Sequence, residues 1–145
     1  MNRDITLIKG GIAVDDRGSL RFANEFHFEG VKRFYQVENY RRGFIRAWHG
    51  HEREGKYVWV SCGSALVGAV PLDAEKGDLS RVKKFVLSDK CPGVLWIPGG
   101  HYNGFMSLEE NTRILFFSTA SMEETQGDDI RLEYDTWNIW QEYFR

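Results

Sequence analysis

Two short segments of the sequence concentrate the residues that could transfer protons. They contain three of the four histidines in the chain. A histidine side chain can take up and return a proton near neutral pH, because its unperturbed pKa is about 6.5. Cationic side chains beside it can stabilise an oxyanion that forms during such a reaction. The first segment, 43–56, holds Arg46, His49, His51 and Lys56, and the second, 97–105, holds His101 and Asn103.

Short strands must position these residues. Runs of β-branched and aromatic residues alternate with turn-like sequences such as HFEG, EREG and SDKCPG, a pattern typical of a β-sandwich or β-barrel. Only the tail, 135–145, has the apolar spacing of a short helix. We therefore predict an all-β fold with a short C-terminal helix and with strands at 19–26, 31–39, 43–51, 56–62, 65–71, 82–87, 94–98, 102–108 and 112–119.

The parity of the first segment requires an irregularity in its strand. In a regular strand His49 and His51 lie on one face, whereas Arg46 lies on the other. A β-bulge near Ala47 or Trp48 would bring all three side chains to the same face, and bulges are common beside active sites. We therefore expect a bulge at this point.

Composition narrows the classes of protein. At 145 residues the chain has the size of one domain, 1–145, and its net charge of -2 argues against a nucleic-acid partner. Two cysteines are too few for a disulfide framework. The sequence has no apolar run of membrane-spanning length and no apolar segment typical of a signal peptide. We expect a cytoplasmic protein without a membrane partner.

The two segments together resemble the two-part signature of the cupins. Gly43 precedes a His-x-His pair, Gly63 closes the next hairpin, and a Pro-x-Gly sequence begins at Pro98. This resemblance implies a jelly-roll barrel. Where metal-binding cupins have a glutamate and a later histidine, this chain has Gly55 or Lys56 and Asn103. The resemblance therefore favours a site without a metal or other cofactor. A displaced ligand set, His49, His51, Glu54 and His101, remains the basis of a metal-dependent alternative.

Within the cupins, the chain resembles the dTDP-4-dehydrorhamnose 3,5-epimerases and the related nucleotide-sugar 3,4-ketoisomerases. The likeness runs from about Asp15 to Trp140. It rests on the early D-x-R-G sequence, on the Arg-Ala-Trp-His-Gly-His sequence, on Lys-Tyr-Val and on the Ile-Pro-Gly-Gly-His-Tyr-Asn-Gly-Phe sequence; these begin at Asp15, Arg46, Lys56 and Ile97. The segment from Tyr134 to Trp140 is similar to the endings of both families.

The resemblance implies proton abstraction next to the C4 ketone of a dTDP-4-keto-6-deoxy-hexose, in the synthesis of cell-surface polysaccharides. His49 matches the family's base, with His51 as a second proton carrier. Arg46 and Lys56 would lie near the enolate oxygen, because they supply positive charge. Arg17 matches the arginine that binds the diphosphate. Tyr57, His101 and Asn103 complete the expected substrate-binding set.

One departure from the epimerases bears on the reaction. Met122 stands where they have a tyrosine that acts as the opposing acid, and methionine cannot donate a proton. The His-x-His pair and the compact length of the chain favour a ketoisomerase or a single-site epimerase. A sugar-nucleotide binding protein without catalysis is a further alternative. The aromatic tail is expected to pack on the barrel or on a second subunit, and we expect a homodimer.

Overall fold

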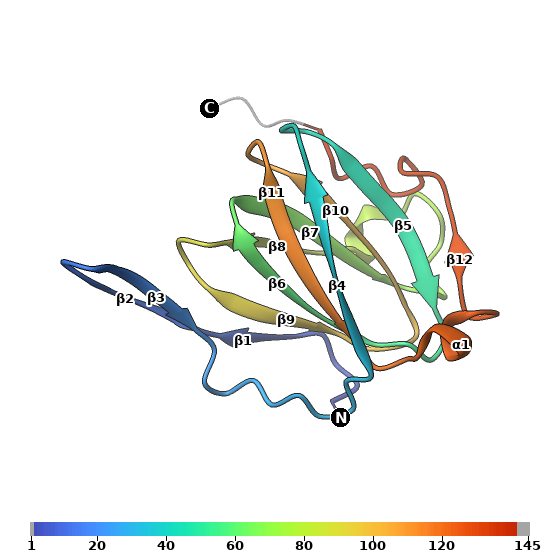
Figure 1. Ribbon diagram of the computed structural model, residues 1–145. Helices are drawn as coiled ribbons and strands as arrows, with labels where there is room; N and C mark the ends of the chain where they lie inside the picture. Colours follow the sequence, from blue (N-terminus) through green and yellow to red (C-terminus); the bar gives the residue numbers. More distant parts are fainter. Residues whose placement is uncertain (1, 142–145) are drawn as a thin grey trace.

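The computed structural model describes residues 2–141, and two five-stranded antiparallel sheets make up most of it (Figure 1). The first sheet has the order β1-β9-β6-β11-β4 and the second the order β12-β5-β10-β7-β8, while β2 and β3 form a separate hairpin. The elements are β1 (Thr6–Lys9), β2 (Gly11–Asp15), β3 (Gly18–Phe22), β4 (Arg33–Asn39), β5 (Ile45–His51), β6 (Lys56–Cys62), β7 (Ser64–Pro71), a 3₁₀ turn (Leu79–Arg81), β8 (Lys83–Ser88), β9 (Gly93–Ile97), β10 (His101–Ser107), β11 (Thr112–Ser118), α1 (Met122–Thr125) and β12 (Ile130–Arg131).

The hydrophobic core lies between the two sheets. Along β6, Val58 and Val60 belong to this core, whereas Tyr57 packs in a separate cluster with Val94 and Trp96. This alternation is the period of two that a strand imposes on its side chains. The face of β6 that carries Val58 and Val60 also carries Lys56, which is buried. A strand that packs the barrel interior therefore also delivers a lysine to it. The all-β jelly-roll fold expected from the sequence is confirmed.

The chain after β12 covers the second sheet. Trp137, Ile139 and Trp140 are buried in one cluster with Trp48 and Tyr102. The indole nitrogens of Trp48 and Trp140 both donate to the carbonyl oxygen of Tyr134, at 3.1 and 3.0 Å. The expected packing of the aromatic tail on the barrel is thus confirmed for these residues.

The predicted helix over 135–145 is wrong for the described part of that range. Residues 135–141 form turns and irregular chain, because their apolar side chains pack directly on the second sheet and do not line one side of a helix. The remaining residues of the range, 142–145, lie outside those that the structure describes. The short α-helix of the fold is α1, which lies earlier, and a capping box formed by Ser121 and Glu124 begins it.

The bulge expected in β5 is confirmed. His49 pairs with Asn103 and Arg46 pairs with Phe105, so Ala47 and Trp48 lie opposite the single residue Gly104. A Cβ atom on Gly104 would lie only 2.4 Å from the Cβ of Ala47. The missing side chain therefore makes room for the extra residue. None of the described helices is long and apolar enough to cross a membrane.

Candidate active site

A cavity of about 620 Å³ opens between the two sheets. Its walls come from β4, β5, β6, β10 and β11, and the segment from α1 to β12 closes one side. Because of the bulge, Arg46 before it and His49 and His51 after it all line the cavity. The lining residues are Arg33, Tyr35, Val37, Arg46, His49, His51, Glu54, Lys56, Asn103, Phe105, Phe116, Met122, Thr125, Gln126, Gly127, Asp129 and Arg131.

His49 is half-buried in this cavity in the form that a base requires. Burial lowers the pKa of its imidazole, and the positive charges of Lys56 and Arg131 lower it further. Both causes act in the same direction because each disfavours the imidazolium ion. At pH 7 the ring is therefore mostly neutral and can accept a proton. Asn103 from β10 donates to the backbone carbonyl of His49 at 3.4 Å, which ties the two strands together beside the ring.

His51 is buried, and its tautomer follows from a single contact. Its Nδ1 lies 2.5 Å from the backbone carbonyl oxygen of Asp128, an atom that can only accept. Nδ1 therefore carries a proton, and in the neutral ring Nε2 has the free lone pair. Nε2 lies 3.9 Å from Oε2 of Glu54. His51 can thus accept a proton only at the nitrogen that faces this carboxylate.

Charged side chains surround the two imidazoles. Lys56 Nζ lies 3.6 Å from Glu54 Oε2, and Arg33 Nη2 lies 3.8 Å from Glu54 Oε1. Arg46 is held by Asn39, whose Oδ1 accepts from Nε at 2.8 Å. Arg131 Nε donates to Asp129 Oδ2 at 3.0 Å. The cations that line the cavity outnumber the carboxylates, so its charge favours an anionic ligand.

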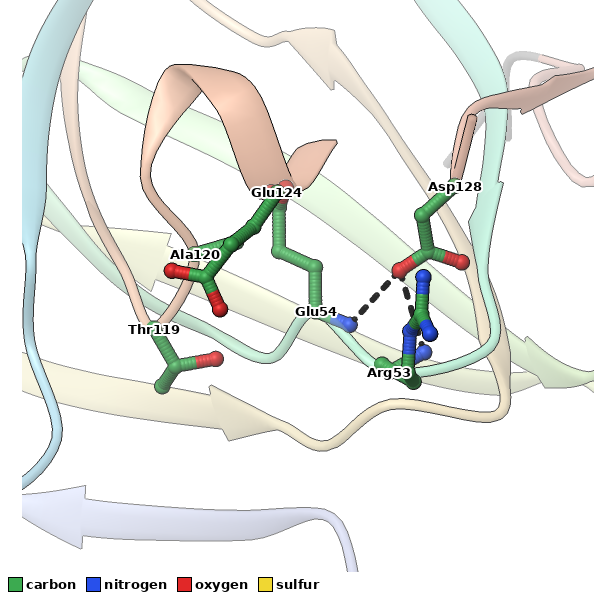
Figure 2. A pocket seen from close by; sticks show the side chains of 6 residues that line it. All are labelled: Arg53, Glu54, Thr119, Ala120, Glu124 and Asp128. Carbon is green, nitrogen blue, oxygen red and sulfur yellow. Dashed lines mark hydrogen bonds between the residues drawn. The ribbon is translucent and has the colours of Figure 1, made fainter. Parts of the chain in front are cut away.

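Asp128 fixes the turn that joins β5 to β6. Its carboxylate accepts from the backbone nitrogens of Arg53 at 3.1 Å and Glu54 at 3.0 Å (Figure 2). It also accepts from the backbone nitrogen of Glu52, at 2.7 Å. Burial acts to raise the pKa of Asp128, but the three backbone hydrogen bonds outweigh it and hold the pKa below its usual value. This single residue therefore positions the turn with its side chain and His51 with its carbonyl group.

Five of the residues singled out in the sequence meet at the cavity: His49, His51, Lys56, Arg46 and Asn103. The other three lie elsewhere in the chain. Tyr57 is buried outside the cavity, with its ring 4.3 Å from that of Trp96. The Nδ1 atom of His101 lies 3.1 and 3.2 Å from the carbonyl oxygens of Pro98 and Gly99, in a turn. Arg17 is exposed on the β2–β3 hairpin, which projects from the barrel (Figure 1), and it pairs with Asp15 at 2.6 Å.

The cavity also contains residues that sequence reasoning did not select. Tyr35 lines it from β4 and stacks on Phe116, with ring centroids 5.1 Å apart. Among the lining residues in the part of the chain that the structure describes, Tyr35 is the only phenol. The guanidinium of Arg33 lies 5.0 Å from its ring. The sequence signal that could have identified Tyr35 is the alternation along β4. Arg33, Tyr35 and Val37 occupy every second position and are partly buried, whereas Phe34 and Gln36 between them are exposed. Met122 lines the cavity from α1.

The ligand set of the metal-dependent alternative does not assemble. Of its four members, His101 does not line the cavity, and Glu54 is occupied by the hydroxyl of Thr125 and by two cations. Within residues 2–141 no group of three or more histidine, cysteine or acidic side chains is placed to hold a metal ion. The positive charge of Lys56, 3.6 Å from Glu54, would also repel a divalent cation.

The sequence pattern that defines dTDP-4-dehydrorhamnose 3,5-epimerase matches residues 3–143, nearly the whole chain. The chain belongs to this family. Its members and structural neighbours are sugar-nucleotide epimerases and isomerases, so this protein is an isomerase-class enzyme of the dTDP-sugar type.

Three known proteins show how similar this chain is to others. The chain is 28% identical over 107 residues to the spore coat polysaccharide biosynthesis protein SpsL of Bacillus subtilis, covering 71% of each protein. The dTDP-4-dehydrorhamnose 3,5-epimerase of Sulfolobus tokodaii has a TM-score of 0.72 and 25% identity, over 93% of this chain and 81% of that one. A 3,4-ketoisomerase of Thermoanaerobacterium thermosaccharolyticum, in complex with TDP-4-keto-6-deoxyglucose, has a TM-score of 0.66 and 22% identity, over 93% and 91%.

Proposed function

We propose that this protein is a 3,4-ketoisomerase that acts on a dTDP-4-keto-6-deoxy-hexose. The observation that carries the proposal is the presence of two imidazoles of different roles, His49 and His51, in one cavity with Tyr35. A ketoisomerisation moves two protons, one between carbons and one between oxygens. An epimerisation moves only the carbon-bound proton and needs an acid on the opposite face of the sugar. Met122 cannot be that acid.

The proposed reaction uses neutral His49 as the base. It removes the proton from C3, and the electron pair moves to the C4 carbonyl oxygen to form an enediolate. His51 takes the proton of the C3 hydroxyl at Nε2 and gives it to the oxygen on C4. The new C3 carbonyl forms as C4 takes a proton from the phenol of Tyr35, and His49 then releases the proton from C3 to water, from which the Tyr35 phenolate is reprotonated. One proton leaves carbon and one returns, so the product is the 3-keto sugar with a C4 hydroxyl.

The charged groups of the cavity suit this intermediate. Lys56 and Arg46 supply positive charge near the two imidazoles, and preorganised charge of this kind stabilises an oxyanion as it forms. Arg33 and Arg131 also line the cavity, and we propose that their guanidinium groups, which suit phosphate oxygens well, bind the diphosphate of the nucleotide. The nucleotide is proposed to be dTDP because the solved ketoisomerase relative contains a TDP-linked 4-keto-6-deoxy sugar. The similarity to SpsL supports a role in surface polysaccharide synthesis.

We further propose a homodimer. The hairpin exposes Val14 and Leu20, and the segment before β4 and β4 itself expose Phe28 and Phe34, each with about two thirds of its surface accessible. Phe28 and Phe34 both lie against the ring of Phe117, with ring centroids 5.4 and 6.1 Å apart, and a contiguous apolar surface of this kind is typical of an interface. A second copy would also give Arg17 a role, because Arg17 does not line the cavity of its own chain. Light scattering at micromolar concentration tests this, and a monomer would contradict it.

We propose that the protein acts in the cytoplasm. We also propose that residues 1–145 form a single domain. Both cysteines, Cys62 and Cys91, are free and exposed, a state that a reducing compartment maintains. The match of the family pattern from residue 3 to residue 143 supports the single domain.

The proposal is tested by incubating the protein with dTDP-4-keto-6-deoxyglucose in deuterated water and following the sugar by NMR. We expect a dTDP-3-keto-6-deoxy sugar as product, with deuterium at C3 of recovered substrate and none at C5. Inversion at C3 or C5 without a 3-keto product would instead indicate an epimerase. Binding of the substrate with neither exchange nor product would indicate a binding protein.

A further inference from the structure

Two buried polar atoms face one another at the edge of the cavity without a hydrogen bond. They are Nε2 of His51 and Oε2 of Glu54, 3.9 Å apart, in side chains that are 6% and 0% exposed. Among the described residues neither atom has a hydrogen-bond partner. Buried polar groups are nearly always satisfied, so an unsatisfied pair calls for a reason other than stability. Here each atom faces the group that would satisfy it if a proton were present.

Glu54 is held in this orientation from the side opposite His51. The hydroxyl of Thr125 donates to its other oxygen, Oε1, and so fixes the carboxylate to α1. Lys56 and Arg33 lie within 4 Å without a hydrogen bond to it. The backbone nitrogen of Glu54 donates to Asp128, which also fixes the ring of His51 through its carbonyl group. The distance between imidazole and carboxylate is therefore set by the scaffold and not by their own contact.

We infer that Glu54 is the positioning residue for proton transfer by His51. Its carboxylate stabilises the imidazolium ion that forms when Nε2 takes a proton from the sugar. Nδ1 is already protonated against the carbonyl of Asp128, so any proton taken up must arrive at Nε2, beside Glu54. Without the carboxylate, the cations Lys56 and Arg33, which lie within 4 Å of Glu54, would disfavour that imidazolium. This inference rests on the proposed ketoisomerisation and assigns Glu54 to its oxygen-to-oxygen step.

The titratable and charged side chains around His51 come from several elements. They are His49 on its own strand, Glu54 and Lys56 from the β5–β6 turn and β6, Arg33 from β4, Asp128 and Asp129 from the segment before β12, and His101 on the paired position of β10. Asp128 directs its carboxylate to the backbone nitrogens of the turn. Glu54 is therefore the acidic side chain that lies against Nε2 itself.

The decisive variant is Glu54→Gln, which keeps the size of the side chain and removes its charge. We expect dTDP to bind as in the wild type and C3 exchange to stay within about threefold, because His49 performs that step. Isomerisation should fall by at least tenfold, and its pH profile should differ from that of the wild type, whereas the pH profile of C3 exchange should not. Glu52→Gln, two residues away and exposed, is the matched control and should leave both rates unchanged.

Equal isomerisation by Glu54→Gln and wild type would overturn the inference, and so would a parallel loss of C3 exchange and isomerisation. A second measurement uses the wild-type protein and needs neither variant nor activity. In a pH titration by NMR, the ¹³Cδ resonance of Glu54 should move in the pH range where ¹⁵Nε2 of His51 becomes protonated. A Glu54 resonance that ignores this event would contradict the inference. A wild-type protein without isomerase activity would instead refute the proposed function.

Discussion

Replacing Gly104 by alanine tests whether the bulge in β5 builds the active site. The new Cβ would lie 2.4 Å from the Cβ of Ala47 and 3.1 Å from its Cα, and both are atoms that no side-chain rotation can move away. Overpacking of this kind costs about 1–3 kcal/mol. Relief requires β5 and β10 to separate at the bulge, which shifts Arg46 and His49 relative to one another. A displacement of about 1 Å at a reacting group can cost on the order of 10²-fold in rate.

Thermal unfolding and C3 deuterium exchange measure the two effects. For a chain of this size a loss of 1 kcal/mol lowers Tm by roughly 2–4 °C, so we expect a Tm decrease of about 2–12 °C. We also expect a loss of exchange on the order of 10²-fold. Gly93→Ala is the matched control, because its Cβ would lie no closer than 3.2 Å to the end of the Leu7 side chain and 3.3 Å to the carbonyl oxygen of Ile8, and neither residue lines the cavity. It should leave exchange unchanged. A Gly104→Ala protein with wild-type Tm and exchange would refute the structural role of the bulge.

Three further variants probe separate parts of the site. Asp128→Asn should lower the free energy of unfolding at pH 7 by about 1.5–3 kcal/mol. Because the pKa of Asp128 is depressed in the folded protein, this contribution is present above about pH 4 and is lost as the pH falls through the folded pKa. The difference in urea unfolding between the variant and the wild type should therefore be smaller at pH 3.5. Lys56→Met removes a charge that lowers the pKa of His49; the acid limb of the exchange rate should move to higher pH, and an unmoved limb would contradict this cause. Tyr35→Phe should keep C3 exchange within a few fold and lower isomerisation at least tenfold, and equal product formation would remove Tyr35 from the mechanism.

Local patterns were sufficient to predict most of the barrel. The run at 56–62 was predicted with the bounds of β6, because its alternation places Val58 and Val60 in the core. The bulge followed from chemistry, since Arg46 and His49 could share a cavity only if the strand gained a residue. Strands without a core face gave no such signal. In β2, Ile12 and Val14 are exposed, and β12 has only two residues.

The missed site residues depend on contacts between distant parts of the chain. Asp128 binds a turn 74 to 76 positions earlier, and nothing near it in the sequence indicates that partner. Tyr35 resembles any aromatic residue of a strand until β4 is placed beside β11. Glu54 was weighed only as a metal ligand, because the sequence does not reveal that Thr125, Lys56 and Arg33 meet around it. The tail was predicted as a helix because its apolar spacing was read without the sheet that it covers.

The most direct test of the proposed reaction is the deuterium content of C3 after incubation of dTDP-4-keto-6-deoxyglucose with the His49→Asn protein in deuterated water. If His49 is the base, exchange should fall by at least about 10²-fold, while dTDP affinity, measured by calorimetry, stays within a few fold of the wild type. Wild-type exchange in the His49→Asn protein would show that another group abstracts the proton, and it would contradict the mechanism.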